Sequence, residues 1–147
     1  MRPVYWVWPL SGKLVIAETA DQTTAESSVG TVDVGPAEGK RWILLWAALV
    51  IDTNVDNSDS AQIILRTTRT GIGGTPKLAS SSSARDIFGN KCVWPNNVSD
   101  ATTLQYCPLV LDGDTDKIRF RLSTTSTAGN RVWKGTYAYL EIHEGRV

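Results

Sequence analysis

The 147-residue sequence predicts an all-β protein, an antiparallel β-sandwich of about eight strands. Three observations support this prediction. Short segments alternate apolar and polar residues, as half-buried strands do. Clusters of Gly, Asp, Asn and Ser separate these segments at the spacing typical of sandwiches. No segment has a convincing helical pattern. The clearest alternation places Ile118, Phe120 and Leu122 between Lys117, Arg119 and Arg121.

The strand predicted at the centre of the fold is 42–51, in which every residue is apolar. Its ten residues are too few to cross a bilayer, which takes about 20 in a helix. Leu and Ala also favour helices, so the short length and the strand-rich surroundings decide for a strand. Strict alternation gives two apolar faces, so a second cover is needed from the same chain or from a neighbouring subunit. The predicted faces are Trp42, Leu44, Trp46, Ala48 and Val50 on one side, and Ile43, Leu45, Ala47, Leu49 and Ile51 on the other.

The other strands are predicted from the same signals, in chain order. They are 13–20, 29–34, 61–69, one strand within 86–94, 104–111, 117–122 and 131–144. In the last strand Val132, Ala138, Leu140 and Ile142 share one face, and Trp133, Tyr137 and Tyr139 share the other. The polar segment 21–28 and the Gly/Ser-rich segment 70–83 are predicted to be loops.

The first ten residues are predicted to form an extended arm, and residues 11–147 a single sandwich domain. Pro3 and Pro9 exclude a helix there. Trp6 and Trp8 are two residues apart, so an extended chain projects both rings to one side. Such an arm spans up to about 33–36 Å, far enough to reach a neighbour. It could equally add an edge strand to its own sheet, and both alternatives stay open.

Charge and cysteine content limit the partners. Fifteen basic and fifteen acidic residues give zero net charge, which favours neither nucleic acid nor anionic membrane as a partner. Arg66, Arg69, Arg119 and Arg121 are expected on solvated strand faces. The sequence shows no secretory signal pattern, so Cys92 and Cys107 are expected to be reduced.

The sequence offers no catalytic set, and we expect no enzyme activity, no cofactor and no metal site. His143 is the single histidine and lies late in the last predicted strand, one residue from its exposed end, where a histidine is usually a solvated surface residue. Asp112, Asp114 and Asp116 have the first spacings of a calcium loop but lack its glycine and its final glutamate. The triplet Asp52, Asn54 and Asp56 lacks the same two features. These residues are therefore interpreted as turn formers.

Six tryptophans are an excess for this length and suggest contacts with a protein or a sugar. Large rings on the arm and on the central strand are candidate interface residues: Tyr5, Trp6, Trp8, Trp42 and Trp46. Trp42 and Trp46 are also core candidates, because they lie in the apolar run. If the protein binds a ligand instead, the stacking candidates are Trp94, Trp133, Tyr137 and Tyr139.

A series of short motifs carries a family resemblance. Gly35-Pro36-Ala37-Glu38-Gly39-Lys40-Arg41-Trp42 opens the central strand; Pro108-Leu109-Val110-Leu111, the turn Gly113-Asp114 and Ile118-Arg119-Phe120 follow later. Over about 29–144 the chain resembles small jelly-roll proteins of tailed-bacteriophage virions, especially capsid decoration (cement) proteins, with related tail components. The resemblance implies a jelly-roll fold without catalytic residues. It also implies a homo-oligomer, often a trimer, that assembles in the host cytoplasm and sits on the major capsid protein at the capsid surface.

The sequence therefore leads to a non-enzymatic virion structural protein, most directly a capsid decoration protein. The alternative is a ligand-binding β-sandwich, either a carbohydrate-binding module or a receptor-binding tail component. Neither function has a nucleic-acid or membrane partner in this interpretation.

Overall fold

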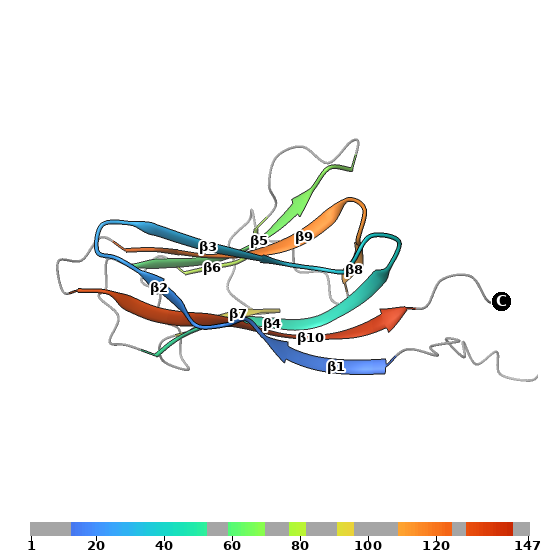
Figure 1. Cartoon of the computed structure of the whole chain (residues 1–147), viewed down its shortest axis with the longest axis horizontal. Coiled ribbons are helices and arrows are strands. Elements are labelled where there is room, and N and C mark those ends of the chain that lie inside the picture. Colours follow the sequence, from blue (N-terminus) through green and yellow to red (C-terminus); the bar gives the residue numbers. More distant parts are fainter. Residues whose placement is uncertain are drawn as a thin grey trace, which may run out of the picture.

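Two antiparallel sheets face each other across one core, and every described element is a strand (Figure 1). The structure is a computed structural model that describes residues 13–52, 59–69, 77–81, 91–95, 109–124 and 129–142. The predicted all-β sandwich is confirmed. Within these ranges, no helix is long and apolar enough to cross a membrane.

The sheet that contains the central strand is called sheet A, and its partner sheet B. Sheet A has the order β1 (Lys13–Glu18), β10 (Arg131–Ile142), β4 (Arg41–Ile51) and β7 (Lys91–Trp94), with β2 (Gln22–Thr24) beside β10 and β8 (Leu109–Asp112) beside β4. Sheet B has the order β3 (Val29–Val34), β9 (Asp116–Ser123), β5 (Ser60–Thr67) and β6 (Lys77–Ser81).

The strand order is that of a jelly roll. With the short strands β2 and β8 set aside, the first of the eight remaining strands pairs with the last, β1 with β10. The second pairs with the second last, β3 with β9, and the nesting continues through β4 with β7 to β5 with β6. This nested pairing across two sheets is jelly-roll topology, as predicted. The two short strands account for ten strands where about eight were predicted.

Two segments predicted to be loops contain strands. β6 lies inside 70–83, where Leu78 and Ala79 are buried and the strand pairs with β5. Pairing and burial outweigh the weak local preference of this Ser-rich segment. β2 lies inside 21–28, where its three polar residues pair with the start of β10. A three-residue polar strand is too short to produce an alternation signal.

The central strand is confirmed as interior, but its predicted faces are wrong beyond Leu44. Along β10, Ala138 pairs with Trp46 and the next residue, Tyr139, pairs with Leu44, so Leu45 forms a bulge in β4. An extra residue reverses the alternation that follows it. The core face of β4 therefore consists of Trp42, Leu44, Ala47, Leu49 and Ile51. Trp46 points to the opposite side of sheet A.

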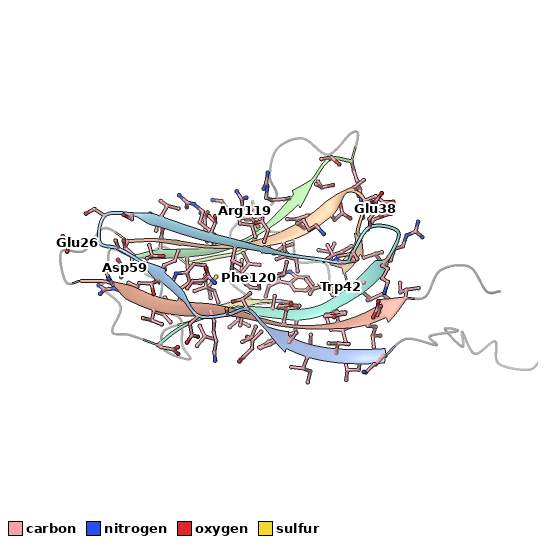
Figure 2. The ribbon with its side chains drawn as sticks, viewed as in Figure 1. Glu26, Glu38, Trp42, Asp59, Arg119 and Phe120 are labelled. Carbon is pink, nitrogen blue, oxygen red and sulfur yellow. The ribbon has the colours of Figure 1, made fainter. Side chains whose placement is uncertain are left out.

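The two sheets pack closely at the middle of the core. Phe120 from β9 lies between the layers, as Figure 2 shows for Phe120 and Trp42. Gly135 of β10 lies directly against its ring, and a Cβ built on Gly135 would be 2.5 Å from Phe120 Cδ2. No side chain fits at this position of β10 without movement of the ring. The backbone of one sheet is thus set at the distance that the aromatic ring of the other requires.

Candidate functional site

The predicted interface residues have different positions in the fold. Tyr5, Trp6 and Trp8 lie outside the described residues. Trp42 is buried in the core. Trp46 is 37% exposed on the outer side of sheet A, so its prediction as a core residue is wrong and the bulge at Leu45 is the reason.

Two of the four predicted ligand-stacking residues are buried in the core. Trp94 and Trp133 are both 0% exposed, so neither can stack on a ligand. The Trp133 indole nitrogen donates to Thr24 Oγ1 at 2.8 Å, which satisfies its only donor inside the protein. Trp133 shares its strand face with Gly135, where the Phe120 ring of the other sheet leaves no room for a side chain.

The other two stacking candidates form an aromatic stack on the inner face of sheet A. The ring centroids of Trp42 and Tyr139 are 3.7 Å apart at 14°, and those of Tyr137 and Tyr139 are 5.9 Å apart at 17°. Tyr137 also packs against Phe120, with centroids 6.3 Å apart. Burial raises the pKa of both tyrosine hydroxyls. These rings are partly buried and stacked on one another, so the stack is a continuation of the core at one end of the sandwich.

The outer face of sheet A, which points away from sheet B, is largely apolar across β1, β10, β4 and β8. Residues paired across antiparallel strands point to the same side, so the register gives the rows of this face. One row crosses four strands and consists of Leu14, Leu140, Ile43 and Val110. The next consists of Ile16, Ala138 and Trp46. A third contains Ala48 and Val93 together with the polar residues Glu18 and Thr136. Side chains extend from this side of sheet A in Figure 2. We call these three rows the apolar face.

The apolar face includes four of the five large hydrophobic side chains that are exposed in the described part of the chain. Ile16 is 76% exposed, Leu14 56%, Val110 45% and Trp46 37%. Single exposed hydrophobic residues are ordinary on a protein surface, but a contiguous group of them marks an interaction site.

Ion pairs lie at both ends of the apolar face. Lys134 Nζ is 3.2 Å from a Glu18 carboxylate oxygen at one end. At the other end Arg41 Nε is 3.4 Å from Asp112 Oδ2. Both pairs are internal to the subunit, so they neutralise the rim of the face.

The outer face of sheet B is charged. Its central side chains are Arg66, Lys117, Arg119, Arg121 and Asp33. Arg119 Nε donates to Asp33 Oδ1 at 2.7 Å, and Arg66 donates to the same carboxylate at 3.1 Å. The hydrogen bonds and charge of Arg119 and Arg66 hold the pKa of Asp33 below its ordinary value. In Figure 2, Arg119 is labelled on this side of the sandwich. The two outer faces therefore differ strongly in polarity.

The acidic turn after β8 uses its carboxylates for hydrogen bonds within the protein. Asp112 Oδ1 accepts from the Asp114 backbone N–H at 3.0 Å, and Asp114 Oδ1 accepts from the Gly39 N–H at 2.8 Å. Asp116 is buried and accepts from Thr67 Oγ1 at 2.7 Å, and it also pairs with Arg69. These carboxylates fix the turn, which is the role of turn formers. Within the described ranges, no group of three His, Cys, Asp or Glu residues could hold a metal ion.

The remaining reactive residues are only partly described. Cys92 is buried in β7, whereas Cys107 and His143 lie outside the described residues. A second charged pair is buried near the start of β10, where Arg131 Nε is 2.8 Å from Asp59 Oδ2. Both side chains are almost fully buried, so this pair is part of the core rather than an accessible site.

Comparison with known proteins gives no relative. No family model, no curated protein and no solved structure matches this chain.

Proposed function

We propose that the protein is a non-enzymatic structural protein of a tailed-bacteriophage virion, most directly a decoration protein that oligomerises on the capsid surface and stabilises the shell. The observation that carries the proposal is the contrast between the two outer faces of the sandwich. One is largely apolar across β1, β10, β4 and β8, and the other is charged.

The fold alone does not choose between functions. Jelly rolls occur both in viral capsid proteins and in lectins, so the argument depends on the surface. A protein that coats a shell needs one surface for association with its neighbouring copies or with the shell, and another surface that stays hydrated. The apolar face suits the first purpose, because burying apolar area drives association. The arginine-rich face of sheet B suits the second.

The ligand-binding alternative receives less support. Trp94 and Trp133 are buried, which removes half of its proposed stacking platform. Tyr137 and Tyr139 stack with Trp42 on the inner side of sheet A. A sugar-binding platform needs aromatic rings that are open to solvent, and these four positions do not provide one.

The N-terminal arm is part of the same proposal. Tyr5, Trp6 and Trp8 are the kind of large rings that act as interface anchors, and we propose that they contact the neighbouring subunit or the major capsid protein. The trimeric state follows from the resemblance alone. Nucleic acid and membrane have no part in the proposed function.

The test is incubation of the full-length protein with undecorated tailed-phage capsids, followed by co-sedimentation and heating of the capsids. We expect saturable binding and an increase in the temperature at which the capsids break. A matched pair of variants locates the surface: Ile16→Lys on the apolar face and Val29→Lys on the outer face of sheet B. Saturable sugar binding on a glycan array, with no binding to capsids, would contradict the proposal and favour the alternative.

A further inference from the structure

We infer that the apolar face is a self-association surface, on which a second copy of this chain packs face to face about a two-fold axis. The inference rests on the proposed function for its biological setting, and it names the partner and the surface that oligomerisation uses. It concerns the protein free in solution, so it can be tested without capsids.

The composition of the apolar face is that of an interface. Leu14 and Ile16 on the edge strand β1, and Trp46 on the interior strand β4, give it exposed large side chains, and Ala138 gives it a small one between Ile16 and Trp46. Among the side chains that the structure describes, two ion pairs lie at the two ends of the face, Glu18 with Lys134 and Arg41 with Asp112. A hydrophobic centre with a polar rim is the usual anatomy of a protein–protein interface.

The outer face of sheet A approaches the size that a stable dimer needs. Its strands are 3 to 12 residues long, and at most four lie side by side. At about 3.3 Å per residue and about 4.8 Å between strands, the six strands together cover roughly 600 Å², and the three rows of the apolar face are roughly half of this area. A standard interface buries about 800 Å² on each partner.

A second copy is the occupant that matches this surface. The face needs an apolar counterpart, and in the described part of the molecule the opposite outer face is charged by Arg66, Arg119 and Arg121. The apolar face of another copy is therefore the complementary surface. Two apolar sheet faces stack as the two layers of a sandwich do, about 10 Å apart.

Charge also favours this arrangement. Glu18 with Lys134 and Arg41 with Asp112 are each neutral as a pair. A two-fold axis through the middle of the face therefore brings these charges against the partner as neutral pairs.

A two-fold contact predicts a dimer rather than the trimer that the resemblance implies. In a trimer with cyclic symmetry the apolar face would meet a different surface of its neighbour, because such contacts are heterologous. The oligomeric state thus separates the inference from the proposed function: a trimer would overturn the first and leave the second standing.

The experiment is sedimentation velocity of four full-length proteins, over about 1–100 µM, which covers the weak end of affinity for interfaces of this size. The wild type is expected at twice the 16.0 kDa chain mass. Ile16→Lys should weaken dimerisation by at least about 100-fold, because both copies lose a large exposed apolar side chain and gain a charge within the apolar face. Val29→Lys is the matched control, since Val29 is 53% exposed on an edge strand of sheet B. It should leave the dissociation constant unchanged.

The fourth protein, a Trp6→Ala and Trp8→Ala double variant, tests whether the N-terminal arm covers the apolar face instead of the apolar face of a second copy. It should remain a dimer if the two faces contact each other directly. Loss of the dimer in this variant, a monomeric or trimeric wild type, or a dimer that tolerates Ile16→Lys would each overturn the inference. Far-ultraviolet circular dichroism of each variant checks the fold. If Ile16→Lys unfolds, Leu14→Ser on the same face replaces it, with the same expected loss of the dimer.

Discussion

Replacing Gly135 with alanine should destabilise the protein, although the same change usually favours a strand. The added Cβ would lie 2.5, 2.6 and 2.7 Å from three ring carbons of Phe120, where ordinary contact begins near 3.4 Å. The ring is fully buried and cannot move into solvent, so the two sheets must separate by about an ångström. Overpacking of this kind costs about 1–3 kcal/mol. At this chain length the melting temperature should fall by about 2–4 °C for each kcal/mol.

Denaturant unfolding followed by tryptophan fluorescence measures this cost, with protein concentration held constant because self-association shifts apparent stability. The midpoint should fall while the slope stays the same. Adding Phe120→Leu to Gly135→Ala should recover part of the lost unfolding free energy, because the smaller side chain makes room for the new Cβ. The double variant should therefore be more stable, by at least about 0.5 kcal/mol, than the sum of the two single-variant losses predicts. Equal or greater stability of Gly135→Ala would refute the close approach of the sheets, because Gly→Ala alone stabilises a compatible site by about 0.4–1 kcal/mol.

Three further predictions test the core and the charged face. Arg131→Met removes the 2.8 Å ion pair between Arg131 and the buried carboxylate of Asp59, and should lower the unfolding free energy by about 3–5 kcal/mol. Trp133→Ala should lose about 3–5 kcal/mol in the same assay and should act through stability rather than through ligand binding, which a glycan array checks. The pKa of Asp33 is lower in the folded than in the unfolded protein, chiefly through Arg119, so its contribution is present above pH 3.8 and is lost as pH falls below it. Asp33→Asn should therefore reduce the loss of stability between neutral and acidic pH, by less than about 1 kcal/mol because the pair is partly exposed; an unchanged difference would contradict this.

Local patterns predict the regular strands of this fold well. β9 has strict alternation, and its apolar residues Ile118, Phe120 and Leu122 are all buried as predicted. β3 has the predicted boundaries, 29–34. Strands that are half buried in a sandwich show their orientation in the sequence, because one face needs apolar residues and the other does not.

The features that the sequence could not give depend on contacts between distant segments. The bulge at Leu45 leaves no trace in β4, because every residue from Trp42 to Ile51 is apolar and a change of phase is invisible. For the same reason Trp46 could not be recognised as exposed. β6 is stabilised by pairing with β5, which its own Ser-rich sequence does not reveal.

The candidate site is a property of the whole sheet and was only partly predictable. The second cover that the central strand requires could be inferred, because both of its faces are apolar. The contribution of β1 could not, since Leu14 and Ile16 become part of the apolar face only through the pairing of β1 with β10. Six tryptophans suggested an interface or a sugar site, yet Trp94 and Trp133 serve the core. The sequence does not show on which side of the sheet a large aromatic side chain will lie.

The most direct test of the account measures whether position 16 becomes buried when copies associate. The Ile16 side chain is 76% exposed in the single chain, so a thiol placed there by Ile16→Cys should react freely with a maleimide at low protein concentration. Peptide mass analysis separates this thiol from the native cysteines, and Val29→Cys provides the matched exposed position on sheet B. Above the dissociation constant, alkylation at position 16 should slow by at least about tenfold, because the thiol reacts only from the dissociated copy, while alkylation at position 29 should keep its rate. Equal rates at position 16 across the whole concentration range would contradict the account.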